Sequence, residues 1–186
     1  DVIAGVSTAA KPSVGTAIVG AFGMVAAMTG MNHTVAHNAG FDAESVHLHP
    51  GSHAGYYPGA KRVSLKLTFE KSTGRILGAQ AIGEDGVDKR IDVIATAMAG
   101  GLTVDDLMDL ELAYAPAYGS AKDAINQAGY VANNVRAGRT SVIHANELAQ
   151  SMHPVIDVRT ASENAAASIP GSVLIPVDEL RDRIAE

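Results

Sequence analysis

Two tyrosines lie close together in the stretch ELAYAPAYGSAKDAIN, residues 111–126. Tyr114 and Tyr118 flank Pro116, whose ring fixes its own φ angle and limits how the segment can move. A phenol held in this way keeps its proton at neutral pH, because its reference pKa is about 10, and it can donate a hydrogen bond to an anion. The residues alone favour a plainer interpretation, in which these are loop tyrosines with an apolar ring and a hydrated hydroxyl.

A second pair, Tyr56 and Tyr57, lies in the segment GSHAGYYPGA, residues 51–60. Its glycines and proline predict a loop. Lys61 and Arg62 follow directly. Cations beside a glycine-rich loop suit phosphate groups, although a solvated strand end is the more ordinary role for such residues.

Three histidines, His47, His49 and His53, precede or enter the same loop. His47 and His49 would share one face of an extended strand, which invites a metal-site interpretation. This spacing alone is a weak signal, so we predict ordinary polar histidines and no metal site.

The chain has 186 residues, of which 47% are hydrophobic and 18% charged, and its formal net charge is −6. This composition predicts a buried core, and the negative charge argues against nucleic acid or an anionic membrane surface as a partner. No apolar run approaches the roughly 20 residues of a membrane-spanning helix, and the first residues lack the pattern of a signal peptide. The absence of cysteine excludes a disulfide, a thiolate metal site and a cysteine nucleophile within this chain, and it fits a cytoplasmic location.

Strands are predicted in the first part of the chain. The apolar segments 15–22 and 24–30 predict neighbouring buried strands, and Asn32 is predicted to cap a short helix. Residues 62–70 alternate apolar and polar side chains, and a turn that ends in glycine leads to a return strand. The segment 62–83 is therefore a predicted β-hairpin of an antiparallel sheet.

Helices are predicted to cover the apolar face of that sheet. Residues 87–101 repeat apolar side chains three and four apart and end in two glycines. Thr103 is predicted to cap a second short helix, with Asp106 as in a capping box. Ser120 is predicted to cap a helix over 121–135, whose small residues permit close packing. Strands followed by helices indicate an α+β fold, with an antiparallel sheet covered by helices.

The pattern changes after Gly138. The segment 153–159 predicts a buried strand and 172–177 a second extended piece, with a helix after each. This order indicates an α/β unit with a parallel sheet, in which Asp157 and Arg159 are predicted to form an ion pair. About 50 residues are too few for a sheet covered on both faces, so the unit is predicted to be truncated.

Four stretches carry a resemblance to known families. SHAGYYPGA and the run KLTFEKSTGRILGAQAIGEDGVDKRIDVIATAMAGGLTVDDLMDLELAYAPAYGSAKDAIN resemble the C-terminal dimerisation domain of coenzyme A-disulfide reductases, from about Gly15 to Val135. These enzymes belong to the pyridine nucleotide-disulfide oxidoreductases, as do NADH oxidases, NADH peroxidases and polysulfide reductases. DVIAG at the start resembles the last turn of the FAD-domain helix that precedes this module. IDVRTASENAAASIPGSVLIPVDELRDRI resembles the first half of a rhodanese domain.

The resemblance implies two domains. Residues 1–136 would form the dimerisation domain, with residues 1–9 as the tail end of the FAD domain. Residues 137–186 would form the first half of a rhodanese-like domain, as a truncated α/β segment.

The resemblance also implies a chemistry. The parent protein would use FAD and NAD(P)H to reduce coenzyme A disulfide, a persulfide or a polysulfide, with coenzyme A as a further possible ligand. Its redox cysteine and its G-x-G-x-x-G turn would lie in FAD and NAD domains that this chain lacks. The chain alone is expected to be inactive and to bind no cofactor, and its partners would be a second copy in a homodimer and those missing domains. The alternatives are a stand-alone, non-catalytic dimerisation or binding module, and a sulfurtransferase part that is inactive here for lack of a cysteine.

In the family, the loop that corresponds to the one carrying Tyr114 and Tyr118 crosses to the other subunit, beside that subunit's flavin and redox cysteine. By resemblance, Tyr114 would act there in trans, either as a hydrogen-bond donor to a sulfur anion or as a proton donor to a leaving thiolate. Tyr56 would be its companion, and Tyr57 and Tyr118 are the adjacent alternatives.

The resemblance assigns further contacts. Four residues of the tyrosine loop would place their backbone near the partner's FAD: Tyr114, Ala115, Pro116 and Ala117. The family usually has a second proline at the last of these positions. Lys61 and Arg62 would be candidates to bind coenzyme A. One of the helices 87–99 and 120–136 would form the homodimer contact, because both have more apolar surface than the sheet needs.

Overall fold

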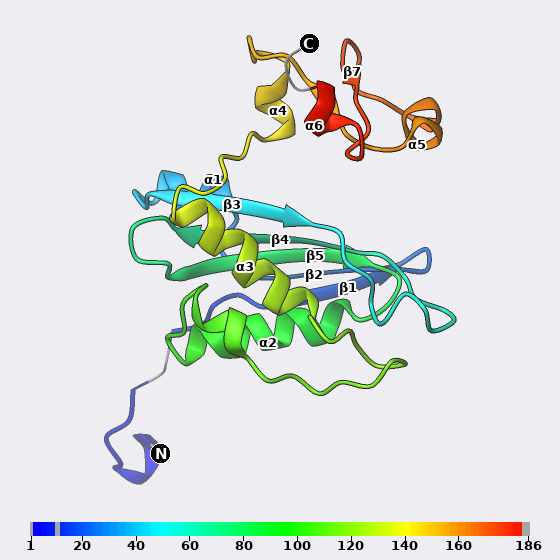
Figure 1. Ribbon diagram of the computed structural model, residues 1–186. Coiled ribbons are helices and arrows are strands. Elements are labelled where there is room, and N and C mark those ends of the chain that lie inside the picture. The colour runs from blue at the N-terminus through cyan, green and yellow to red at the C-terminus, as the bar shows by residue number, and fades with distance from the viewer. Residues whose placement is uncertain (1, 10–11, 184–186) are drawn as a thin grey trace. The chain divides into compact units, whose positions relative to one another are not determined.

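A computed structural model describes residues 2–9 and 12–183 (Figure 1). The chain divides into two compact units, the first ending at Val142 and the second beginning at Ile143. Each unit has its own sheet, and a 3-10 turn, η1 (Val2–Ala4), precedes the first one. None of the helices in the described ranges is long and apolar enough to cross a membrane.

A five-stranded antiparallel sheet forms the first unit, with the strand order β1-β2-β5-β4-β3. Its strands are β1 (Ala17–Ala21), β2 (Met24–Gly30), β3 (Ala43–Leu48), β4 (Val63–Glu70) and β5 (Ile76–Gly83). The predicted hairpin is confirmed, because β4 and β5 pair across a short turn. Gly74 in this turn has a φ of 75°, a left-handed conformation that glycine adopts without steric cost.

Helices α2 (Val87–Ala99) and α3 (Ala124–Arg136) cover one face of this sheet (Figure 1). α2 packs against β2 and β5, and α3 packs against β3 and β4. The alternating apolar side chains Leu65, Leu67 and Phe69 of β4 are buried in the core between these layers. Burial of one such side chain contributes about 1.5–3 kcal/mol. The predicted α+β fold, an antiparallel sheet covered by helices, is confirmed.

The segment 15–22 was predicted to form a buried strand. It forms β1, but the residues of β1 are exposed, so the predicted burial is wrong. β1 lies at the edge of the sheet, and Ile18 and Val19, which point to opposite faces, are both exposed. Apolar composition predicted burial, but composition cannot show which element covers a strand. The β1–β2 turn has positive φ angles at Phe22 and Gly23, the two-residue hairpin geometry that matches strand twist.

The start of α3 also differs from the prediction. The helix begins at Ala124, and its N-cap is Asp123 rather than Ser120. The Asp123 carboxylate accepts a hydrogen bond from the Ile125 N–H at 3.2 Å, and the Asn126 side chain accepts one from the Asp123 N–H at 3.2 Å. This reciprocal capping box satisfies two N–H groups that the first helical turn leaves unpaired, which explains why the helix begins here.

Caps were predicted for two short helices. The prediction for the first helix is confirmed, and the prediction for the second is wrong. Asn32 caps α1 (His33–Asn38) as predicted, by accepting a backbone hydrogen bond from its first turn. The element after Thr103 is a 3-10 helix, η2 (Asp106–Asp109), and Thr103 does not cap it. The Thr103 N–H and hydroxyl instead both donate to Asp106 at 2.7 Å, so they close the turn that precedes the helix.

The small residues of α3 permit a close approach to η2, as predicted. Ala128, Gly129 and Ala132 are buried, and a side-chain carbon added at Gly129 would lie 2.9 Å from the Met108 backbone nitrogen. This face of α3 is therefore filled within the first unit. A homodimer contact, which was predicted to use either α2 or α3, does not lie on this side of α3.

The second unit contains two short strands, β6 (Ile156–Asp157) and β7 (Val173–Leu174), which pair in parallel as predicted. Its helices are α4 (Ala145–Leu148), α5 (Ala161–Ala166) and α6 (Leu180–Arg183). The prediction of a buried strand over 153–159 is wrong, because only two of these residues form β6 and Ile156 is exposed. Two such short strands cannot bury a sheet face. The predicted ion pair is confirmed, with Arg159 Nη2 lying 2.7 Å from Asp157 Oδ2.

Candidate active-site loops

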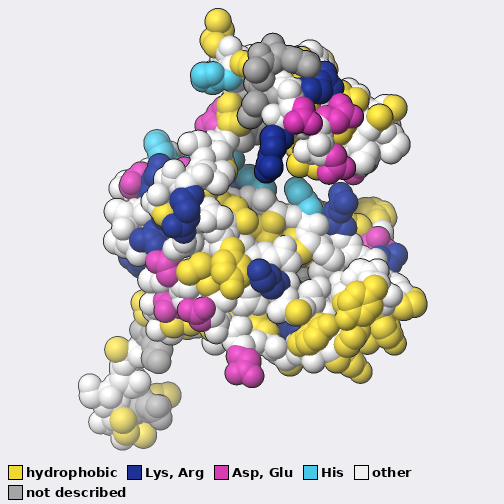
Figure 2. All heavy atoms as spheres, viewed as in Figure 1, with side chains coloured by type: hydrophobic (Ala, Val, Ile, Leu, Met, Phe, Trp, Pro, Cys, Tyr) yellow, Lys and Arg dark blue, Asp and Glu magenta, His cyan; other side chains and the backbone are white. Residues whose placement is uncertain are grey.

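Two long loops meet at one end of the first sheet. We define the first tyrosine loop as residues 49–62, between β3 and β4, and the second tyrosine loop as residues 110–123, between η2 and α3. The strand register places Val25, Gly83 and Val63 side by side, so the β1–β2 turn and the first tyrosine loop leave the sheet at the same end (Figure 1). Figure 2 shows hydrophobic side chains, a group that includes tyrosine, gathered where these loops lie, at the lower right.

The two tyrosine loops bring Tyr56 and Tyr114 into contact. Their hydroxyl oxygens lie 2.9 Å apart and share a hydrogen bond, although the residues are 58 positions apart in the chain. Both rings are exposed, Tyr56 at 77% and Tyr114 at 49%. The hydrogen bond with Tyr56, helped by partial desolvation, raises the pKa of Tyr114 above its ordinary value. Tyr114 therefore presents a neutral phenol to the surroundings at physiological pH.

Tyr57 and Tyr118 do not belong to this pair. The Tyr57 ring contacts the His53 ring edge-on, with 5.8 Å between centroids, and the Tyr118 ring is 76% exposed. The loop tip that carries Tyr118 is nevertheless ordered, because the Ala115 carbonyl accepts hydrogen bonds from the N–H groups of Tyr118 and Gly119. The geometry thus separates Tyr56 and Tyr114 from the two alternatives.

The predicted phosphate-binding cations lie at the base of the first tyrosine loop. Lys61 Nζ lies 2.8 Å from Glu84 Oε2, and this partner raises the pKa of Lys61 through its hydrogen bond and its charge. Arg62 pairs through its backbone with Gly51, which closes the loop. The charge of Lys61 is thus already compensated, which weakens its case as a phosphate ligand.

The three histidines have separate surroundings. His49 Nδ1 is hydrogen-bonded to Ser64 Oγ at 2.9 Å, and His53 is buried against its own loop. His47 and His49 line a groove of about 540 Å³ on the sheet face opposite α2 and α3, beside apolar residues such as Met28 and Ile82. Within residues 2–9 and 12–183, no three histidine or carboxylate side chains gather as a metal ion would require.

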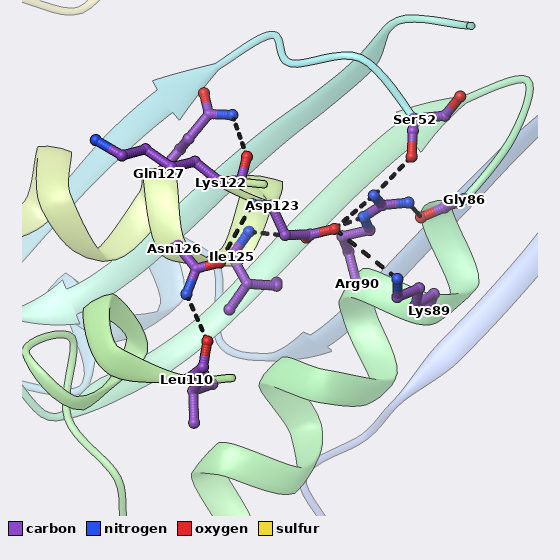
Figure 3. Close-up of polar contacts among 10 residues, drawn as sticks. All are labelled: Ser52, Gly86, Lys89, Arg90, Leu110, Lys122, Asp123, Ile125, Asn126 and Gln127. Atoms are coloured by element: carbon purple, nitrogen blue, oxygen red, sulfur yellow. Dashed lines mark hydrogen bonds and ion pairs between the residues drawn. The ribbon is translucent and has the colours of Figure 1, made fainter. Parts of the chain in front are cut away.

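A buried arginine lies beneath both tyrosine loops (Figure 3). The Arg90 guanidinium of α2 is 1% exposed and donates to both carboxylate oxygens of Asp123, at 3.2 and 2.7 Å. It also donates to the Ser52 carbonyl at 2.7 Å and to the Gly86 carbonyl at 3.1 Å. Lys89 Nζ lies 3.9 Å from the same carboxylate. One side chain therefore joins α2, the first tyrosine loop and the end of the second.

Sequence reasoning identified neither Arg90 nor Asp123 as a residue of this site. A signal was present, because Arg90 lies on the apolar stripe of α2 with Val87, Ile91 and Ile94. An arginine on a buried stripe requires a buried acceptor, since an unpaired buried charge is strongly unfavourable. The sequence cannot show which carboxylate supplies that acceptor.

The two-layer fold and its paired loops correspond to a known class of domain. Residues 16–125 match the family model described as pyridine nucleotide-disulphide oxidoreductase, dimerisation domain, and the chain belongs to this family. The predicted resemblance is thus confirmed for these residues.

Individual members of this family are also similar to the chain. Coenzyme A disulfide reductase of Staphylococcus haemolyticus is 43% identical over 125 residues, which cover 67% of this chain and 28% of that protein. The crystal structure of reduced Bacillus anthracis CoADR-RHD is 46% identical, covers 93% of this chain and 32% of its own, and has a TM-score of 0.88. An NAD-dependent persulfide reductase from A. fulgidus is 39% identical, with 94% and 32% coverage and a TM-score of 0.85. The chain thus spans less than a third of the length of these relatives.

Proposed function

We propose that this chain is the dimerisation and site-completing part of an FAD- and NAD(P)H-dependent disulfide reductase. Its substrate would be coenzyme A disulfide, a persulfide or a polysulfide, since its relatives include a coenzyme A disulfide reductase and a persulfide reductase. The observation that carries the proposal is the hydrogen-bonded pair of Tyr56 and Tyr114, exposed at the meeting point of two ordered loops.

In this proposal the pair acts in trans, on the active site of the partner subunit in a homodimer. The phenol of Tyr114 donates a hydrogen bond to the sulfur anion that forms when a disulfide bond breaks, which stabilises the negative charge. Tyr56 orients that phenol. The raised pKa of Tyr114 keeps its proton in place, so this donor persists across the neutral pH range.

The chain's own residues fit a peripheral contact with a flavin rather than a flavin pocket. Ala115, Pro116 and Ala117 are only half-buried at the tip of the second tyrosine loop, so their backbone remains open to contact. No glycine-rich dinucleotide-binding turn is present in the sequence. When bound, FAD supplies the reducing equivalents for the disulfide, and the residues from Tyr114 to Ala117 would border it in the partner subunit.

Residues 137–186 are proposed to form part of a rhodanese-like domain. The first unit ends at residue 142, so it accounts for 76% of the 186 residues. The two solved structures match a larger share of the chain, 93% and 94%. Their similarity therefore extends into the second unit. The alternative function is a sulfurtransferase part that is inactive within this chain, because no cysteine is present here to carry a persulfide.

Replacement of Tyr114 by phenylalanine in the full-length enzyme tests the proposal. Turnover of the disulfide substrate is expected to fall at least about 100-fold, the lower range for loss of a positioned proton or hydrogen-bond donor. Flavin absorbance and the dimer on gel filtration should be unchanged. Tyr130→Phe is the matched control, because Tyr130 lies on α3 and contacts Lys122 rather than Tyr56. Unchanged turnover in Tyr114→Phe would refute the role of Tyr114 and make Tyr118 the next residue to replace.

A further inference from the structure

We infer that Arg90 and the capping box Asp123–Asn126 are positioning residues, which hold the two tyrosine loops so that the phenols of Tyr56 and Tyr114 meet. This inference deepens the proposed function and rests on it for its relevance to catalysis. The geometric part, the contact between the two phenols, can be tested without any enzyme assay.

The second tyrosine loop is closed at its base by Asn126. The Asn126 side-chain amide donates to the carbonyls of Leu107 at 3.1 Å and Leu110 at 3.0 Å, where the loop begins. Its side-chain oxygen accepts from the N–H of Asp123, where the loop ends. One buried side chain therefore fixes the separation of the two ends of the loop (Figure 3).

Arg90 fixes the first tyrosine loop to the same point. Its guanidinium donates to the Ser52 carbonyl and to both oxygens of Asp123, so each loop has an anchor on one planar group. Gly86 makes room for this arrangement, because a side-chain carbon there would lie 2.2 Å from Arg90 Nη1. Lysine could not replace the guanidinium, since an ammonium lacks the planar fork.

The anchors lie close to the tyrosines in the chain. Tyr56 follows Ser52 by four residues, and Tyr114 follows Leu110 by four residues. A direct hydrogen bond of 2.9 Å from the Ala54 N–H to the Gly119 carbonyl joins the two loops between the anchors and the phenols. A shift at the anchors therefore reaches the phenols through short, hydrogen-bonded segments.

Stability alone does not explain why the charges of Arg90 and Asp123 are buried. Desolvation of two ions offsets much of their attraction, and well-packed apolar residues often serve stability equally well. A second arginine–aspartate pair, Arg136 with Asp105, is more exposed than Arg90 with Asp123; it links the other end of α3 to the segment before η2 and contacts neither tyrosine loop. This second pair supplies a matched control, because it shares the chemistry of Arg90 and Asp123 but not their position.

The test is the alkaline titration of tyrosinate absorbance in the full 186-residue chain. Three tyrosines are first replaced by phenylalanine, so that the signal comes only from Tyr56 and Tyr114: Tyr57, Tyr118 and Tyr130. Arg90→Lys is expected to move the ionisation of Tyr114 towards lower pH, because the hydrogen bond with Tyr56 that raises the pKa of Tyr114 is loosened. Arg136→Lys should leave the titration unchanged. A Tyr56→Phe background should abolish the effect of Arg90→Lys, as a double-mutant cycle requires for coupled groups.

The inference is overturned if Arg90→Lys lowers the melting temperature but leaves the titration in place, since Arg90 would then serve stability only. An equal shift in the Tyr56→Phe background would overturn it too. If Arg90→Lys does not fold, Asp123→Asn replaces it, because asparagine keeps the capping oxygen but loses the charge. An unmoved titration, or an equal shift in the Tyr56→Phe background, would then overturn the inference in the same way. Since the titration is read without substrate, its result is independent of the turnover test of Tyr114.

Discussion

The contact between Tyr56 and Tyr114 shows how far individual residues could be predicted. The sequence marks both as tyrosines in proline-containing loops, and the family resemblance pairs them. It does not show that their hydroxyls meet, because that contact depends on two loops 58 residues apart. Tyr57 is adjacent to Tyr56 in the chain but points to His53 instead, a choice that only the loop conformation makes.

In the second unit, Asp157 is the residue with a clear pH dependence. Its carboxylate accepts hydrogen bonds from Arg159 and Asn164, and the Arg159 guanidinium in particular holds the pKa of Asp157 well below its usual range. A carboxylate with a lowered pKa stabilises the fold above its unfolded pKa of about 3.9, and the contribution disappears as pH falls through the lowered value.

Asp157→Asn is therefore expected to lower the melting temperature of the second unit at pH 7. It should also reduce the loss of stability below pH 4, because the titrating group is gone. Thermal unfolding of the full chain followed by circular dichroism at pH 7 and at pH 3 measures both effects. Asp178→Asn, at an exposed position, is the control. An unchanged melting temperature at pH 7 would show that the ion pair contributes nothing.

For the helices and strands, the periodicity of the apolar residues correctly predicted which faces are buried in the core. The alternation in β4 and the three- and four-residue spacing in α2 both correspond to buried faces. The start of α3 was misplaced because Ser120 and Asp123 are both good N-caps, and only the packing of Asp123 on Arg90 favours the second. Exposure of β1 was missed because an apolar strand has the same composition whether or not an element covers it.

The approach of α3 to η2 gives a prediction at this scale. Gly129→Ala is expected to destabilise the first unit by about 1–3 kcal/mol, because the added carbon meets backbone atoms of Met108 and Val104 at 2.9 Å. The higher helix propensity of alanine, worth about 1 kcal/mol, offsets only part of this. Urea unfolding measures the change.

Gly100→Ala is the matched control for that experiment. Gly100 has a φ of −80°, and an added carbon would have no neighbour closer than 3.4 Å. Its substitution should be neutral or stabilising by up to about 1 kcal/mol. Equal effects at the two glycines would contradict the packing argument.

For the whole molecule, exposed apolar surface and exposed tyrosines lie on the same unit. Val19, Met24 and Ile82 remain exposed in a domain whose family is defined by dimerisation. Exposed apolar residues that gather on a surface mark sites of interaction. The homodimer contact was predicted on a face of α2 or α3. The structure adds the bare sheet face as another exposed apolar surface, which composition could not show because it does not reveal which face the helices leave uncovered.

The proposed function depends most on Tyr114 serving the active site of the neighbouring subunit. Hybrid dimers of the full-length enzyme test it directly. One subunit carries Tyr114→Phe and keeps the redox cysteine that the proposed function places in the FAD domain, and the other keeps Tyr114 and has that cysteine replaced by serine. Each variant alone is expected to form dimers with greatly reduced turnover.

If Tyr114 acts in trans, mixing and re-assembly restores one complete site in each hybrid dimer, so turnover should rise to as much as half the wild-type value per hybrid dimer. If Tyr114 acts within its own subunit, no hybrid contains a complete site. Turnover that stays at the level of the separate variants, in dimers shown by mass spectrometry to be mixed, would contradict the proposal.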